Sequence, residues 1–292
     1  MNYTIKNEFI TFVSSSFAAE QKSLKINSDP SVDYVWQRLP GCWNRNGPMC
    51  FPLLGDFPNN KYILDGKEYE MTIHGFAMDS EFSVVEHTAT SITYELTSSP
   101  ETLKQYPYDF KLDVKYSLDG MTVNMEYIVT NTGKETMWYS VGGHPGFTCP
   151  LTPGEKFEDC YIEFNKTEKI ESVRQFHSPI SVFEKYFGRS GKVIPLDYEI
   201  FYNGAIVFKG LNSDKVSIRS KKSSRFVEMD ITGFPYFTLW TIKDQPFICL
   251  EPWHGVITQG DIPDQNHWKK REAMQTLEPG KTFRCNHPVT IG

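Results

Sequence analysis

The sequence predicts an all-β protein folded as a large antiparallel β-sandwich. Short runs of alternating apolar and polar residues follow one another along most of the chain. Asp65-Gly66 and Asp119-Gly120 separate such runs, and Asp-Gly between alternating runs is a strong hairpin signal. No stretch sustains the period of about 3.6 residues that marks an amphipathic helix. Strands joined by hairpins and packed in layers are therefore expected.

The alternation places the expected strands in order along the chain. It predicts two hairpin regions, residues 61–71 and 115–141, with turns at the Asp-Gly pairs and at Asn131-Thr132-Gly133. The second region ends in an expected strand at residues 137–141. Further strands are expected at residues 91–99, 205–211, 215–220, 225–231, 237–242 and 247–252. Only residues 100–106 and 182–187 are predicted to form short helical turns.

Composition is typical of a globular protein with a sizeable core. The 292 residues are 39% hydrophobic and 14% aromatic, without a low-complexity linker or a convincing internal repeat. The simplest interpretation is one domain spanning residues 1–292. A net charge of −6 argues against a nucleic-acid partner or an anionic membrane surface. No apolar run approaches the ~18 residues that a membrane span needs.

The cysteine pattern indicates a reducing compartment. Six cysteines occur without a C-x-x-C pair, as expected of free thiols in a cytoplasmic protein. Residues 9–19 (FITFVSSSFAA) are apolar enough to resemble a signal segment, but three serines interrupt them and Glu8 offsets Lys6. A secretory signal is therefore not expected.

Three polar residues interrupt the β pattern in a way that indicates chemistry. His144 lies in VGGHPGFTCP (residues 141–150), directly after an expected strand, and His74 precedes a glycine in TIHGFAMD. Glu251 closes the apolar run FICL, which predicts that its carboxylate is at least partly buried. Alone, each residue also fits a structural role, as a satisfied imidazole or a paired carboxylate. Together, two imidazoles and one carboxylate suit proton transfer near neutral pH.

Other chemistries lack matching motifs. The chain has no H-E-x-x-H or H-x-H pair of the kind that binds zinc. It also lacks the G-x-S-x-G elbow of serine hydrolases and the glycine-rich loops that bind nucleotides. A zinc site therefore fits less well, and nucleotide-binding and serine-hydrolase functions have no positive support.

Five stretches, in a shared order along the chain, resemble the aldose 1-epimerase (galactose mutarotase) family, especially its LacX-like branch. They are DYVWQ (33–37), FPLLG (51–55), HGFAMD (74–79), GGHPGF (142–147) and CLEPW (249–253). The resemblance implies a galactose mutarotase-like supersandwich, which agrees with the hairpin pattern. It also implies a cofactor-free isomerase that interconverts the anomers of a free hexose.

The resemblance assigns a role to each of the three candidates. His144, in the His-Pro motif, corresponds to the general acid that protonates the ring oxygen of the sugar. Glu251 corresponds to the general base at the anomeric hydroxyl. His74 corresponds to the histidine that supports the ring oxygen and neighbouring hydroxyls. The glycines around His144 are expected to let the backbone turn sharply and the sugar approach closely.

The sequence departs from the family pattern at three sugar-binding positions. LacX-like members usually carry arginines where this chain has Asp56 and Met78, and most family members an aspartate where it has Gly204. We expect substrate preference, and the extent of activity, to differ accordingly. Arg45 is a candidate replacement for a missing arginine. Trp253, next to Glu251, is a candidate stacking surface for a pyranose, or else an ordinary core aromatic.

Three other functions remain open at this stage. A non-catalytic carbohydrate-binding β-sandwich would bind sugars without accelerating mutarotation. A sugar-phosphate epimerase is disfavoured by the missing arginines, since arginine forks grip phosphate best. A glycoside hydrolase generally needs two carboxylates across the scissile bond, and Asp230 is a poor second candidate.

Overall fold

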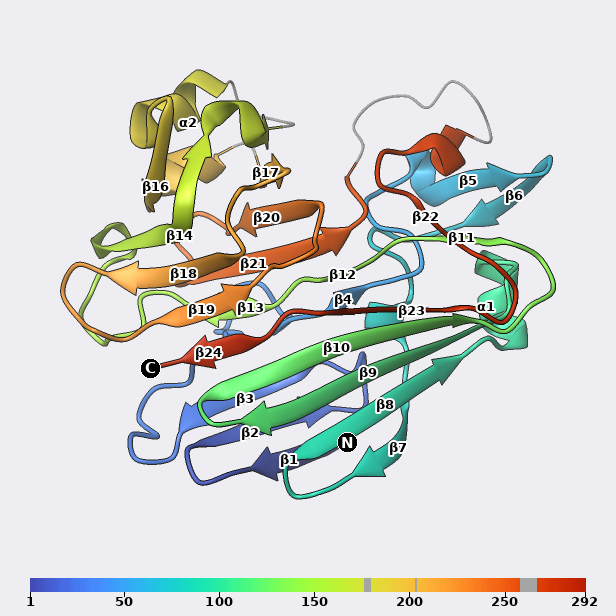
Figure 1. Ribbon diagram of the computed structural model, residues 1–292, viewed down its shortest axis with the longest axis horizontal. Coiled ribbons are helices and arrows are strands. Elements are labelled where there is room, and N and C mark those ends of the chain that lie inside the picture. The colour runs from blue at the N-terminus through green and yellow to red at the C-terminus, as the bar shows by residue number, and fades with distance from the viewer. Residues whose placement is uncertain (176–179, 203, 258–266) are drawn as a thin grey trace.

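The computed structural model describes residues 1–175, 180–202, 204–257 and 267–292, apart from the side chains of Gln175 and His267. Antiparallel sheets dominate this part of the chain (Figure 1). The prediction of an all-β, antiparallel architecture is therefore confirmed. No helix among the described residues has both the length and the apolar character to cross a membrane.

The larger sheet has ten strands, which come from several separate parts of the sequence. Its strand order is β16-β14-β18-β19-β24-β10-β9-β8-β7, with β23 also paired to β10. The strands are β7 (Ser83–His87), β8 (Ser91–Thr97), β9 (Phe110–Asp119), β10 (Thr122–Asn131), β14 (Cys160–Lys169), β16 (Ser190–Pro195), β18 (Lys215–Ser220), β19 (Val227–Asp230), β23 (Thr282–Asn286) and β24 (Val289–Ile291).

The second sheet has seven strands and carries the candidate site. Its order is β15-β17-β20-β21-β12-β4, and β13 pairs with β21. The strands are β4 (Met49–Cys50), β12 (Val141–Gly143), β13 (Gly146–Thr148), β15 (Val173–Gln175), β17 (Ile206–Lys209), β20 (Tyr236–Trp240) and β21 (Phe247–His254).

Smaller elements complete the fold. The remaining strands are β1 (Asn2–Lys6), β2 (Ile10–Ser15), β3 (Gln21–Ile26), β5 (Lys61–Leu64), β6 (Lys67–Glu70), β11 (Met137–Tyr139) and β22 (Gln275–Leu277). The helices are α1 (Pro100–Gln105) and α2 (Ile180–Phe187), and 3₁₀ turns occur at Pro58–Asn60, Ala77–Asp79, Phe157–Asp159, Ile170–Ser172, Tyr198–Phe201 and His267–Lys270. Both α-helices lie where short helical turns were predicted.

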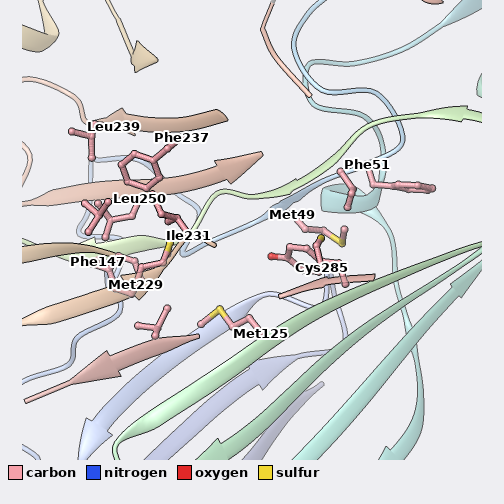
Figure 2. Close-up of a cluster of buried hydrophobic side chains, with 14 of the residues drawn as sticks. Met49, Phe51, Met125, Phe147, Met229, Ile231, Phe237, Leu239, Leu250 and Cys285 are labelled. Carbon is pink, nitrogen blue, oxygen red and sulfur yellow. The ribbon is translucent and has the colours of Figure 1, made fainter. Parts of the chain in front are cut away.

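Apolar side chains from both large sheets form a continuous core. In β10 the odd-numbered residues from Val123 to Val129 are buried, as the alternation predicts. Figure 2 shows Met125 of β10 in the same cluster as Phe237 of β20 and Leu250 of β21. Leu250 thus packs one face of β21 against the core. The odd-numbered residues of β21 project from the opposite face.

The Asp-Gly turns connect strands as the sequence predicts. Asp65 and Gly66 have φ of 51° and 80°, the left-handed conformation that a two-residue hairpin turn of type I′ requires. Asp119 lies opposite Thr122 in the β9–β10 pair, so Gly120 sits in an equally tight link. The expected strand at residues 137–141 is instead divided between β11 and β12, which pair with different sheets.

Candidate functional site

Two short strands pair with β21 in one continuous register. Gly142 of β12 lies opposite Trp253, and Gly146 of β13 lies opposite Cys249. The chain between the two glycines is therefore a brief interruption in a ladder whose register does not change. Side chains directly opposite each other in an antiparallel pair project from the same face of the sheet.

The interruption brings His144 opposite Glu251. His144 lies midway between the two glycines, and its Nε2 is 3.3 Å from Oε2 of Glu251. Both side chains are nearly buried, with exposed fractions of 8% for His144 and 1% for Glu251. Within the described part of the chain, Nδ1 of His144 and Oε1 of Glu251 have no hydrogen-bond partner. The pair therefore keeps unsatisfied polar atoms available to a ligand.

Burial moves the two pKa values in opposite directions. It lowers the pKa of His144 to about 3, helped by the neighbouring His74 and the charge of Arg45. It raises the pKa of Glu251 well above the usual value of a glutamate. Since the apolar surroundings disfavour charge on both groups, the pair holds one proton between them over a wide pH range.

The glycines beside His144 serve close packing rather than a sharp turn, which corrects our expectation. Gly142, Gly143 and Gly146 lie in β12 and β13, and none of them has a positive φ. A Cβ at Gly142 would lie 2.5 Å from Cδ1 of Trp253, and one at Gly146 would lie 2.8 Å from Cζ3 of Trp43. These residues are glycine because aromatic rings press directly on the backbone.

His74 joins the pair from a strained backbone position. Its ring centroid lies 5.7 Å from that of His144, in an edge-to-face arrangement. His74 has φ of 64°, held by hydrogen bonds of its N–H to Gly55 and of the Phe51 N–H to its carbonyl, at 2.8 and 3.0 Å. The Gly55 N–H also donates to Nδ1 of His74, at 3.3 Å. Burial lowers the pKa of His74 to about 4, so the ring is neutral. Since Nδ1 accepts the Gly55 N–H, the ring proton is on Nε2, which can act as a donor.

Arg271, which the sequence analysis missed, holds the loop that positions His74. Its guanidinium donates to the carbonyl oxygens of Leu54 and Asp56 at 3.2 and 2.7 Å, and lies 3.9 Å from the ring centre of Phe57. Arg271 is buried. No local motif frames it, so only the three-dimensional structure reveals it. The guanidinium of Arg271 thus contacts Asp56, the position at which the family pattern has an arginine.

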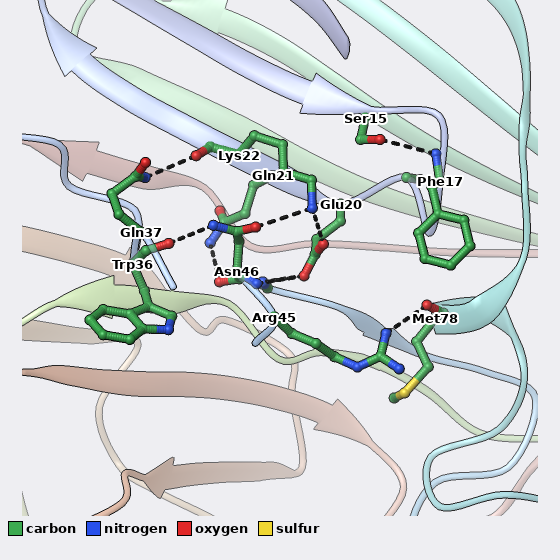
Figure 3. Close-up of polar contacts among 12 residues, drawn as sticks. Ser15, Phe17, Glu20, Gln21, Lys22, Trp36, Gln37, Arg45, Asn46 and Met78 are labelled. Atoms are coloured by element: carbon green, nitrogen blue, oxygen red, sulfur yellow. Dashed lines mark hydrogen bonds and ion pairs between the residues drawn. The ribbon is translucent and has the colours of Figure 1, made fainter. Parts of the chain in front are cut away.

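Arg45 occupies the corresponding place at the second departure. It donates to the carbonyl oxygen of Met78 at 2.8 Å (Figure 3). It also pairs with Asp79 at 2.6 Å. Its positive charge also contributes to the lowered pKa of His144. Arg45 therefore lies within electrostatic reach of the candidate acid, beside the position where an arginine was expected.

A buried carboxylate supports the segment that carries His144. Glu20 accepts hydrogen bonds from the N–H groups of Asn46 and Gly47 at 2.6 and 2.9 Å, as Figure 3 shows for Asn46. The next residue, Pro48, accepts the N–H of His144 at 2.9 Å. The orientation of His144 therefore depends on a segment that Glu20 fixes.

The aromatic residues beside the pair differ from the one that the sequence indicated. Trp253 has no exposed surface, and its indole N–H donates to the carbonyl of Gly143 at 3.1 Å. This favours the core-aromatic interpretation of Trp253. The rings of Trp43 and Trp240 lie 5.2 and 5.5 Å from that of His144, and both are only half-buried. Spacing alone could not identify them, because Trp43 lies far from the motif.

The remaining sequence candidates lie away from the pair or have backbone explanations. Asp230 is in β19, in the other large sheet, where it accepts the N–H of Thr232 at 2.8 Å. It is therefore not a second carboxylate facing Glu251. Gly204 has φ of 117°, a conformation in which an aspartate would be strained.

Comparisons with known proteins agree on one family. A model of the family described as aldose 1-epimerase matches residues 1–288. Protein LacX, encoded on a plasmid of Lactococcus lactis subsp. lactis, is 32% identical over 301 residues, covering 100% of this chain and 99% of LacX.

Solved structures show the same similarity. A galactose mutarotase related enzyme from Lactobacillus acidophilus has a TM-score of 0.88 at 32% identity, covering 100% of this chain and 97% of that one. A galactose mutarotase-like protein from Lactobacillus casei has a TM-score of 0.88 at 27% identity, with 100% of both chains covered. The predicted galactose mutarotase-like fold is thereby confirmed.

The raised pKa of Glu251 predicts a pH-dependent effect of Glu251→Gln on stability. Below the usual value of 4.5, folded and unfolded chains both hold the proton and the carboxyl costs nothing. As the pH rises, the unfolded chain releases its proton first, so the folded state loses ~1.4 kcal/mol per pH unit up to the raised pKa. Thermal melts should show Glu251→Gln gaining several degrees of Tm over the unsubstituted protein between about pH 4 and pH 7.5. An equal difference in Tm at both values would contradict a buried, high-pKa carboxyl.

Arg271→Gln should weaken the fold around His74. The substitution leaves the Leu54 and Asp56 carbonyls short of donors in a buried setting, so the free energy of unfolding should fall by ~2–4 kcal/mol. Arg284→Gln is the matched control, since Arg284 pairs with Glu126 on the surface and should contribute ~0–1 kcal/mol. Chemical denaturation measures both variants, and equal losses would refute the bracing role of Arg271.

Proposed function

This chain belongs to the aldose 1-epimerase family, and we propose that it interconverts the α and β anomers of a free hexose by acid–base ring opening. The observation that carries the proposal is the buried His144–Glu251 pair, with 3.3 Å between Nε2 and Oε2. The anomeric hydroxyl and the ring oxygen of a pyranose share C1 and lie side by side. Two adjacent groups of opposite proton affinity match that arrangement.

The proposed reaction proceeds from the form of the pair in which the shared proton has passed from the Glu251 carboxyl to His144, leaving Glu251 ionised. Glu251 takes the proton of the O1 hydroxyl, the freed electron pair forms the C1=O1 bond, and the C1–O5 bond breaks. O5 takes the proton of His144 as it receives the bonding electrons. Rotation about C1–C2 and reclosure by the reverse transfers give the other anomer. Each cycle returns both catalysts to their starting state without a metal or redox cofactor.

The neighbouring residues have supporting roles in this proposal. Neutral His74 donates its Nε2–H to the ring oxygen or an adjacent hydroxyl. Trp43 and Trp240, with their remaining exposed surface, offer apolar faces to the C–H side of a sugar. Trp253 supports the pair from the core, and Arg45 contributes its positive charge and is our candidate for a hydroxyl contact.

An unphosphorylated sugar fits better than a sugar phosphate. Arg45 is already paired with Asp79, and Arg271 is buried against backbone carbonyls. Neither guanidinium offers the free fork that a phosphate group recruits. The six cysteines, all free thiols in the described structure, support a cytoplasmic setting for this reaction.

Polarimetry tests the proposal directly, with freshly dissolved α-glucose and α-galactose as substrates. Glu251→Gln should slow anomer interconversion by ~10²–10⁴-fold, which is ~3–5 kcal/mol of barrier, because the amide cannot accept the O1 proton. His144→Asn should slow it similarly, and the two losses should not add because both groups act in one step.

Asp230→Asn is the matched control, since this carboxylate lies in the other sheet and should leave the rate unchanged. Folded Glu251→Gln protein that equilibrates the sugars at the unsubstituted rate would make Glu251 a structural carboxylate. Sugar binding without any acceleration in the unsubstituted protein would establish the non-catalytic carbohydrate-binding function instead.

The shared proton predicts an unusually broad pH optimum. The active pair gains a second proton only near the lowered pKa of His144, about 3, and loses its single proton only above the raised pKa of Glu251. The kcat/KM for mutarotation, measured where the protein stays folded, should therefore stay flat as the pH passes through the ordinary histidine value of ~6.5. A fall with a midpoint near the ordinary histidine value of ~6.5 would contradict this proton inventory.

A further inference from the structure

A thiol adjoins the His144–Glu251 pair and has no part in the proposed reaction. Cys249 lies two residues before Glu251 in β21, so both side chains project from the same face of the strand. One donor atom from each of His144, Cys249 and Glu251 lies within 4.8 Å of the other two. Three different metal-ligand types thus converge from two paired segments.

We propose that His144, Cys249 and Glu251 form a site for a thiophilic divalent cation, such as Zn²⁺, which would occupy the acid–base pair. Ligand atoms around a tetrahedral zinc lie ~3.3–3.6 Å apart, given Zn–N, Zn–O and Zn–S distances of ~2.0–2.3 Å. Nε2 of His144 and Oε2 of Glu251 are already 3.3 Å apart. The cysteine sulfur lies within 4.8 Å of the other two ligand atoms, so a small movement of Cys249 would complete three ligands.

The surroundings favour a divalent ion over a monovalent or a hard one. A thiolate and a carboxylate balance two positive charges, so the occupied site is neutral, as an apolar environment requires. One sulfur and one nitrogen among the three ligands suit Zn²⁺. They disfavour Mg²⁺ and Ca²⁺, which prefer oxygen ligands. Three protein ligands leave a fourth position for water, as in zinc sites that are open on one side.

A second observation indicates that the pair is receptive to a ligand. Oε1 of Glu251, on a side chain that is 1% exposed, has no hydrogen-bond partner in the described structure. Among the described residues, no hydrogen bond to Oε1 prevents the carboxylate from rotating to bind a metal ion. No sequence motif marks this site. Cys249 and Glu251 come from one strand, while His144 comes from a distant segment of the sequence.

The proposed function links occupancy to activity. A cation on His144 and Glu251 removes both the acid and the base, so mutarotation should stop while the ion is bound. This consequence rests on the proposed function, whereas the binding of the ion does not. The two parts therefore need separate measurements.

Cobalt binding tests the site without reference to activity. Titration of the full chain with Co²⁺ under anaerobic, reducing conditions should produce visible bands of tetrahedral Co²⁺ and a near-ultraviolet thiolate-to-cobalt band, saturating at one ion per chain. Cys249→Ala should abolish the thiolate band and weaken binding at least ~100-fold, beyond the ~10–100-fold lost when a residue that only hydrogen-bonds a metal ligand is changed. Cys249→Ser is the backup if the alanine variant does not fold. Mg²⁺ should leave the spectra unchanged.

Cys50→Ala is the matched control, because Cys50 is another buried thiol whose pKa is raised by burial and by the charge of Glu251. It should keep the thiolate band and the affinity. No cobalt bands in the unsubstituted protein, or bands that persist in Cys249→Ala, would overturn the site.

Polarimetry with added Zn²⁺ then tests the consequence. Zn²⁺ should inhibit the unsubstituted protein, and Cys249→Ala should keep the metal-free rate while needing at least tenfold more Zn²⁺ for the same inhibition. A protein that binds Co²⁺ at Cys249 but never accelerates mutarotation would leave the metal site standing and refute the proposed function. Equal zinc sensitivity of both proteins would refute inhibition through this site.

Discussion

The structure of the site depends on one buried contact, between an imidazole and a carboxyl that share a proton across two strands. Burial disfavours the charged form of each partner, so the pair rests as a neutral imidazole and a protonated carboxyl, with one proton to exchange between them. Such a pair functions only if its geometry is maintained by other contacts. Glu20 supplies part of that support by accepting hydrogen bonds from the backbone of Asn46 and Gly47. The aromatic rings packed on Gly142 and Gly146 supply the rest.

Most strands could be predicted because period-two alternation and Asp-Gly turns are local properties. The same holds for His144, His74 and Glu251, which stand out beside special backbone or at the end of an apolar run. Arg271 and Cys249 could not be found this way, since their importance comes from register and from contacts between distant segments. The glycines beside His144 were also identified from the sequence, but the sharp turn expected of them was wrong, because tight packing and turn formation can require the same residue.

Two arginines from other segments lie beside the positions where the family pattern has arginines in the sequence. The positions of Asp56 and Met78 lack the arginines of the family pattern, yet Arg271 and Arg45 donate to the carbonyl oxygens of these same two residues. The guanidinium groups reach the site edge from other segments of the chain. Substrate preference should therefore be inferred from where the charges lie in space as well as from the aligned positions.

The uninterrupted register of β12 and β13 along β21 restricts how this region can change in evolution. Gly142 and Gly146 keep the same ladder on both sides of His144. Inserting or deleting one residue between them would turn one of the two short strands over, so that its side chains faced the opposite side of the sheet. A change of length is therefore disfavoured here, so the spacing of these glycines is as informative about a relative as the histidine between them.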